Sequence, residues 1–326
     1  MKEYIKTFET ESAMTEYLAD ADIDVFVGYT KDDEKVHWSD AIPVPYEEQY
    51  FTIESLEDGN EIKYFDNYNI YPLSASTDNG KTWTEYKAST SGTTIATLNT
   101  GKKVLIKAIE INSAAAYNIF SWFNASKQHN VYGNAMSLIY SDDFIGKTSL
   151  KTSRQFIYLL SDNASLISAE NLILPVTTLA DQCYYGMFQN CTSLTTAPKL
   201  PALNLANGCY QQMFQGCTSL ATAPELPATT LTDQCYEKMF SGCTSLTTAP
   251  ELTALYLNYH CYNNMFNGCS NLIYIKCLAT DKSGADSTTA WVEGVAASGT
   301  FIKAASMNDW SNDTSGIPYG WTVVDV

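Results

Sequence analysis

The stretch Cys183-Tyr184-Tyr185-Gly186-Met187-Phe188-Gln189-Asn190-Cys191 decides the fold, because its framework returns along the chain. Further copies begin at Cys209, Cys235 and Cys261, each 26 residues after the one before. A fixed period of this length is the sequence signature of a solenoid, in which each repeat forms one turn and stacks on its neighbours. We therefore expect a stack of turns in this part of the chain.

Comparison of the copies separates the expected core from the expected surface. The Cys, Tyr, Met-Phe and second Cys positions are the same in every copy, and leucines recur between them, so these side chains are expected to face inward. The leucines are Leu179, Leu205, Leu231, Leu257, Leu194, Leu220, Leu246, Leu272, Leu200, Leu226 and Leu252. Two sets of positions change in size and charge, and we expect them to face water or a ligand. They are the pairs Tyr185-Gly186, Gln211-Gln212, Glu237-Lys238 and Asn263-Asn264 in one set, and Lys199, Glu225 and Glu251 in the other.

Local patterns predict one short helix and one short strand in each repeat. Residues 181–190 place apolar side chains at helical spacing, with Asp181 and Asp233 positioned as N-caps. The Ser-Leu-Thr-Thr-Ala text that follows favours a strand. Proline ends it in the first three copies, at Pro198, Pro224 and Pro250, since proline cannot donate a hydrogen bond to a sheet.

The repeated text M-F-x-x-C-T-S-L-x-x-A-P-x-L-P resembles the A-F-x-x-C-x-x-L-x-x-I-x-L-P repeat of BspA-like leucine-rich repeat proteins. These proteins are common in gut Bacteroidales and among the proteins that their phages encode. The resemblance covers residues 155–278 and departs from the family in a longer period and in the Met before the Phe. It implies an α/β solenoid and leaves the ligand open.

Charge and composition exclude several classes of partner. The chain has 326 residues, of which 36 are acidic and 19 basic, and a net charge of −17 repels nucleic acid and anionic lipid. Arg154 is the single arginine. No apolar run is long enough to cross a membrane, so we expect no membrane insertion. The N-terminus has no apolar signal segment, which favours a protein made and used without secretion.

Nine cysteines raise the question of disulfides or metal. Eight of them obey the repeat and Cys277 follows the last copy, so we expect small, buried, reduced side chains stacked from turn to turn. The Cys-x₇-Cys spacing lacks the short clamp of a zinc site. We expect neither a metal nor a cofactor.

Residues 1–46 are expected to form a small α+β anchoring unit. The patterns predict a helix over 11–18, a strand over 23–29, a charged turn over 31–35 and a strand over 36–38. The text Y-T-K-D-D-E-K-V-H-W resembles the N-terminal segment of virion proteins from Bacteroides phages. A generic hairpin explains the same residues.

Residues 47–112 alternate between strands and turns, which favours an immunoglobulin-like β-sandwich. Strands are predicted over 50–53, 61–65, 81–84 and 103–108. Residues 76–83 match the S-x-D-x-G-x-T-W pattern of the Asp box of sialidase propellers. A propeller needs several copies and a sialidase needs an arginine cluster, so we interpret this single copy as a tight hairpin with Asn79-Gly80 at its turn.

The remaining segments are assigned around the repeats. Residues 113–152 are expected to be a connector that covers the first turn, followed by the solenoid over 153–278, which starts with an irregular copy. Residues 279–326 carry Trp291, Trp310 and Trp321, and we expect these large aromatic side chains to close the end of the core.

No catalytic constellation is found. His37, His129 and His260 lie in three different modules, and no known catalytic motif occurs, so we expect a protein that is not an enzyme. The leading hypothesis is a structural or host-attachment component of a phage particle, located in the virion. Its partners would be other virion proteins and a host-surface protein or glycan, and it would form a homo-oligomer when assembled. The alternative is a BspA-like adhesin on a bacterial cell surface.

Overall fold

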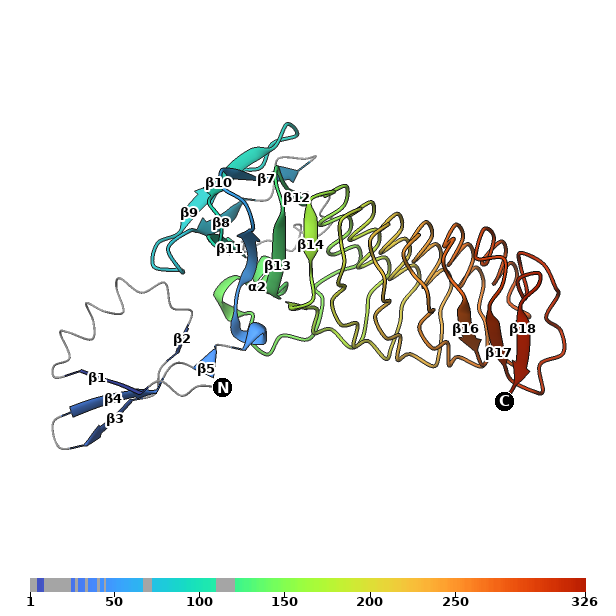
Figure 1. Ribbon diagram of the computed structural model, residues 1–326. Coiled ribbons are helices and arrows are strands. Elements are labelled where there is room, and N and C mark those ends of the chain that lie inside the picture. Colours follow the sequence, from blue (N-terminus) through green and yellow to red (C-terminus); the bar gives the residue numbers. More distant parts are fainter. Residues whose placement is uncertain are drawn as a thin grey trace.

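The chain is mostly β, with several sheets, and none of those in its described part is closed (Figure 1). The computed structural model describes residues 5–8, 25–26, 29–32, 35–39, 42–43, 45–66, 72–109 and 121–326. Among these, helix is confined to η1 (Tyr46–Glu48), α2 (Ser137–Tyr140) and η2 (Ser141–Asp143).

The first strands form two small antiparallel sheets. One has the order β1 (Ile5–Phe8), β4 (Lys35–Ser39), β3 (Tyr29–Asp32), and in the other β2 (Val25–Phe26) pairs with β5 (Ile42–Pro43). Asp32 lies opposite Lys35 at the end of the pair β3–β4, so residues 31, 32 and 35 of the predicted charged turn lie in strands, and residues 33–34 lie outside the described residues. The strand predicted over 23–29 is described only in β2 and in the first residue of β3. The helix predicted over 11–18 lies outside the described residues.

Two larger sheets follow. The smaller has the order β10 (Thr93–Leu98), β7 (Asn60–Asp66), β12 (Ser121–Ala125). The larger has the order β14 (Leu166–Ser168), β13 (His129–Asn134), β6 (Phe51–Ser55), β11 (Lys103–Ala108), β8 (Leu73–Ser76), β9 (Thr84–Tyr86), with β15 (Leu172–Ile173) also paired to β13.

Aromatic side chains join these two sheets. Phe123 of β12 stacks on Phe51 of β6 at 5.4 Å between ring centroids and on Tyr64 of β7 at 5.1 Å. All three rings are almost fully buried. β12 and β13 lie within the predicted connector of residues 113–152, which therefore supplies a strand to each sheet. The strand predicted over 81–84 starts only at Thr84.

The Asp-box text forms the loop of the β8–β9 hairpin with Asn79-Gly80 at its turn, as predicted, but the loop over 77–83 is longer than the tight hairpin expected. The Oδ1 atom of Asp78 accepts hydrogen bonds from the Ser76 hydroxyl at 2.7 Å and from the Thr82 N–H at 2.9 Å, and its Oδ2 accepts one from the Thr82 hydroxyl at 2.6 Å. Asn79 and Gly80 have φ of 59° and 80°, the left-handed conformation that these residue types tolerate. The carboxylate thus orders the turn.

β13 connects the sheets to the repeats, because it pairs antiparallel with β6 and parallel with β14 and β15. His129 on this strand is fully buried. Its Nδ1 lies 2.9 Å from the carbonyl oxygen of Lys127 and its Nε2 lies 3.1 Å from Nδ2 of Asn163. Nδ1 therefore donates and Nε2 accepts, which requires a neutral ring. Burial lowers the pKa of His129 to about 4.

Beyond this junction the chain winds in successive turns that lie side by side (Figure 1). Alternate N–H groups leave each turn: those of Tyr184 and Gly186 donate to the carbonyl groups of Cys209 and Gln211, both at 2.9 Å. Each of the remaining N–H groups donates to the carbonyl group three residues earlier in the same turn. The N–H of Met187, for example, donates to the carbonyl of Tyr184 at 3.3 Å.

The short helix predicted over 181–190 is therefore wrong. An α-helix needs its N–H groups for its own turns, whereas here every second group bonds to the neighbouring turn. Residues at four-residue intervals adopt positive φ, as in type II turns: 54° at Gln182, 56° at Gly186 and 59° at Asn190. The strand predicted in each repeat forms in the copies at the two ends, as β14 and β16, but in the copies between them it is reduced to isolated bridges such as Thr248 with Tyr274.

The predicted inward-facing residues form continuous rows. Tyrosine rings from Tyr184 to Tyr262 stack at 5.7 to 6.2 Å, and phenylalanine rings from Phe188 to Phe266 at 5.3 to 5.8 Å. The leucines between them are buried, except that Leu205 is half-buried. All nine cysteines are buried and unpaired, as predicted.

The stacked turns continue past Cys277 into the predicted C-terminal segment. Trp291 extends the tyrosine row at 6.0 Å from Tyr262 and is fully buried. Its indole N–H donates to the carbonyl of Gly316 at 2.8 Å. Trp310 stacks on it at 5.5 Å, so two of the three expected tryptophans lie together at this end. A parallel sheet of β16 (Tyr274–Cys277), β17 (Thr300–Lys303) and β18 (Thr322–Asp325) completes the chain.

Candidate binding surface

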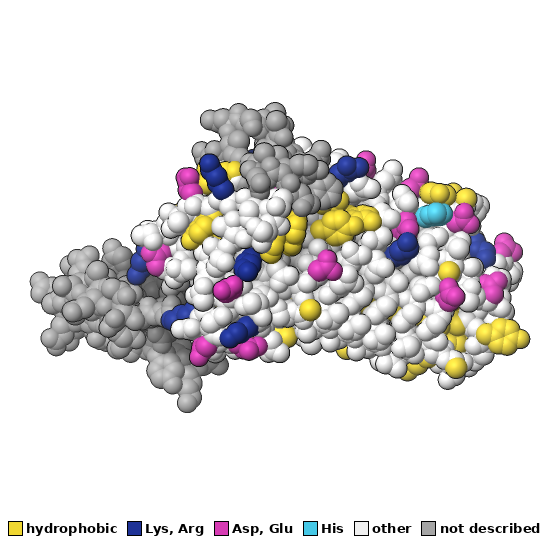
Figure 2. Space-filling model, turned by 90° about the horizontal axis from the view of Figure 1, so that it is seen from above, with side chains coloured by type: hydrophobic (Ala, Val, Ile, Leu, Met, Phe, Trp, Pro, Cys, Tyr) yellow, Lys and Arg dark blue, Asp and Glu magenta, His cyan; other side chains and the backbone are white. Residues whose placement is uncertain are grey.

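The backbone of the turns sets out rows of outward-facing positions. Because each turn is hydrogen-bonded to the next in a constant register, as Tyr184 is to Cys209 and Gly186 to Gln211, equivalent side chains of successive turns lie next to one another. We call the surface formed by the side chains of residues 182–190, 208–216, 234–242 and 260–268 that do not belong to the buried rows, together with the flanking Tyr158 and Tyr259, the polar face. Figure 2, seen from above, shows a surface that is mostly white, the colour of the backbone and of uncharged polar side chains, with charged and hydrophobic side chains scattered over it.

The first set of predicted ligand-facing residues lies on the polar face but is more buried than expected. Gln211, Glu237 and Asn263 are only 9%, 7% and 8% exposed, so they have little contact with water, and that they face a ligand stays a prediction. Their polar groups bond instead to neighbouring side chains of the face. Tyr185 is half-buried beside Tyr158, with ring centroids 5.2 Å apart.

The second predicted set, Lys199, Glu225 and Glu251, is exposed, as expected. Glu251 forms an ion pair with Lys276 at 2.6 Å. No hydrogen bond or ion pair joins this set to the first one in the described part of the chain, so the structure does not bring the two predicted sets into one site.

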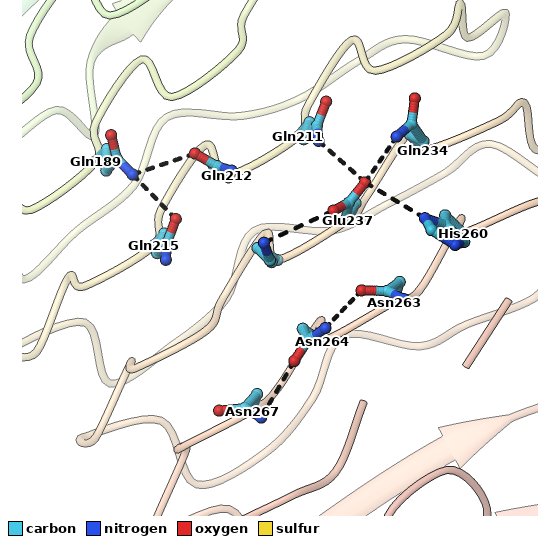
Figure 3. Close-up of polar contacts among 11 residues, drawn as sticks. Gln189, Gln211, Gln212, Gln215, Gln234, Glu237, His260, Asn263, Asn264 and Asn267 are labelled. Atoms are coloured by element: carbon cyan, nitrogen blue, oxygen red, sulfur yellow. Dashed lines mark hydrogen bonds and ion pairs between the residues drawn. The ribbon is translucent and has the colours of Figure 1, made fainter. Parts of the chain in front are cut away.

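Glu237 is the centre of the polar contacts (Figure 3). Its Oε2 accepts hydrogen bonds from Nε2 of Gln211 and from Nε2 of Gln234, each at 3.0 Å. Lys238 Nζ lies 3.8 Å from its Oε1, and His260 Nδ1 lies 4.0 Å from its Oε2. Side chains from three turns, two amides, one lysine and one imidazole, therefore surround this carboxylate.

Two clusters of amides flank Glu237. In one, Nε2 of Gln189 donates to the side-chain oxygens of Gln212 and Gln215 at 3.2 and 3.0 Å (Figure 3). In the other, Asn264 donates to Asn263 at 2.5 Å and accepts from Asn267 at 3.2 Å. Sequence comparison had singled out Gln212 and Asn264 but missed Gln189, Gln215 and Asn267, which occupy one equivalent position of the repeats. The signal was present, because these positions also change from copy to copy while remaining polar in most of them.

An aromatic group lies on each side of these amides along the chain. Tyr158 and Tyr185 meet edge to face, and the ring of Tyr158 covers Gly186 so closely that a Cβ there would come within 2.4 Å of it. At the other side, Tyr259 is 44% exposed and stacks on the ring of His260 with centroids 3.9 Å apart.

The cysteine thiols offer no nucleophile. Burial raises the pKa of Cys183 and of Cys235 to about 12, so both stay protonated at neutral pH. In the other row, the thiol of Cys217 donates to the carbonyl of Phe188 at 3.1 Å, and Cys243 donates likewise to Phe214. These contacts give the thiols a structural role between turns.

Comparisons with known proteins add no relationship: no protein-family model matches the chain, and no curated protein or solved structure matches it significantly. None of the helices described is long and apolar enough to traverse a lipid bilayer. The geometry of the chain therefore carries the functional argument.

Proposed function

We propose that this chain is a non-enzymatic attachment protein whose repeats form a leucine-rich solenoid with a 26-residue period. The observation that carries the proposal is the division between identical buried rows and changing outward positions. The rows from Tyr184 and Phe188 build a rigid core, while the positions outside it are free to vary in chemistry. This division is typical of repeat proteins that present an extended binding surface.

We further propose that the protein is a phage virion component and that residues 1–46 anchor it to the particle. The resemblance of the hairpin over 29–38 to virion proteins supports this location. The immunoglobulin-like assignment of residues 47–112 and the C-terminal cap over 279–326 belong to the same proposal, as does a homo-oligomer in the assembled particle. The alternative is a bacterial surface adhesin, which the resemblance of the repeats to BspA-like proteins favours.

Immunogold electron microscopy tests the location. An antibody against the full chain is applied to phage particles and to bacterial cells of the source, with non-immune antibody as control. Labelled particles are expected. Label restricted to the bacterial surface would replace the virion proposal with the adhesin. A chain that starts at Glu47 should fold yet no longer enter particles, and its packaging at the normal level would show that residues 1–46 are not the anchor.

A further inference from the structure

We infer that the polar face binds an uncharged, extended glycan lying along the stack of turns. The inference rests on the attachment role proposed above and adds the chemical class of the ligand. It is carried by the hydrogen-bonding groups, the aromatic rings and the paired charges of this face.

The amides of the face keep hydrogen-bonding capacity for a ligand. A side-chain amide has two N–H donors and an oxygen that accepts. Gln189 uses only its Nε2, and Gln212 and Gln215 use only their oxygens, so among the described residues one amide oxygen and two NH₂ groups have no protein partner. All three side chains are half-buried, which holds them in place while they still reach solvent. Hydroxyl groups, which both donate and accept, satisfy such a mixed array.

Flat rings lie on both sides of the amides. The C–H faces of sugar rings pack well on aromatic surfaces, and tyrosine combines such a surface with a polar end. Tyr259 supplies one, since it is 44% exposed and is held by its stacking on His260. Tyr185 and Tyr158 supply another. Tyr185 and its counterpart Asn263 lie three turns apart. At the ~4.8 Å spacing of hydrogen-bonded neighbouring chains this separation is about 15 Å. A ligand that contacts both ends of the face must therefore be extended.

Charge excludes the competing ligand classes. The carboxylate of Glu237 is already held by Gln211, Gln234 and Lys238, and Arg154 is the single arginine of the chain. Phosphate, sulfate and carboxylate groups are bound by arginine forks or clustered cations, and the net charge of −17 repels them. Specific protein interfaces have an apolar, fully buried centre, whereas the middle of this face consists of amides. A neutral, hydroxyl-rich polymer fits what remains.

A glycan array that carries neutral and anionic glycans from bacterial capsules and from animal mucosa tests the inference with the full chain. Neutral glycans are expected to bind. Whether the bound glycans come from bacterial capsules or from animal mucosa distinguishes a capsular ligand from a host ligand. Calorimetric titration with the best of these then compares Gln215→Ala and Tyr259→Ala with Glu225→Ala, which changes an exposed residue outside the polar face. Each of the first two variants is expected to bind about tenfold more weakly, equivalent to about 1.4 kcal/mol, and the control to bind as the parent does.

Several results would overturn the inference. They are binding of anionic glycans alone, no neutral glycan bound at all, or equal affinity in Gln215→Ala, Tyr259→Ala and the parent chain. If the chain still binds whole bacterial cells in any of these cases, the attachment role stands and only the ligand class is wrong. If it binds neither cells nor glycans, the attachment role itself fails.

Discussion

Protonation of His129 should destabilise the junction between the sheets and the repeats. The ring is fully buried and neutral, and its pKa is about 4 in the folded chain against an ordinary value of 6.5. Because the unfolded chain takes up a proton first, stability is fully present above pH 6.5 and is lost as the pH falls toward 4. Between pH 7 and pH 5 these two pKa values give a loss of about 2 kcal/mol in the free energy of unfolding.

Urea denaturation followed by tryptophan fluorescence at several pH values measures this loss. The variant His129→Gln has no titrating ring at this position. It should be less stable than the parent at pH 7, but between pH 7 and pH 5 its free energy of unfolding should fall by about 2 kcal/mol less than that of the parent. Leu166→Ala, at a fully buried position opposite His129 in β14, is the matched control: it should be less stable at every pH and keep the parent's pH dependence. An identical pH dependence in the parent and in His129→Gln would refute the reasoning.

Three further predictions concern the turns and the thiols. Thiol titration should find nine reactive groups in denaturant and almost none in the folded chain, since all are buried and unpaired; fewer than nine in denaturant would reveal disulfides. Hydrogen bonds from Thr82 and Ser76 lower the pKa of Asp78 to about 2, so this carboxylate stabilises the hairpin above pH 4 and loses its effect as the pH falls toward 2; a carboxyl that titrates near 4 by NMR would contradict this. Gly186→Ala should lower the melting temperature more than Gly242→Ala. Both glycines have positive φ, but a Cβ at Gly186 would lie 2.4 Å from the ring of Tyr158, whereas a Cβ at Gly242 would lie 3.7 Å from its nearest atom. Equal losses would argue against the close contact with Tyr158.

The buried rows could be predicted because the repeats of the chain can be compared with one another. Tyr184 and its counterparts do not change between copies, and each proved to be buried in a stacked row. The helix over 181–190 was predicted wrongly for a physical reason. Apolar side chains at helical spacing also suit a series of tight turns. What distinguishes these turns from a helix is their hydrogen bonds to residues about 25 positions away. Glycine or asparagine at four-residue intervals, as in Gly186 and Asn190, was the available local signal.

The candidate surface could be predicted only in part. Variation between copies pointed to Gln211 and Glu237, but not to the bond between them, which depends on the close stacking of two turns. The strands β12 and β13 were missed because their partners are distant in sequence: Phe123 pairs with Tyr64, and Val131 with Ile53. Such pairing is decided by burial of both strands, which no local pattern records.

Attachment is measured most directly by flow cytometry of the fluorescently labelled full chain on intact Bacteroidales cells. The proposal predicts saturable binding that unlabelled chain competes away, with the variant Gln215→Ala binding more weakly and Glu225→Ala binding as the parent does. Signal no higher than that of an unrelated acidic protein, on every strain tested, would contradict it.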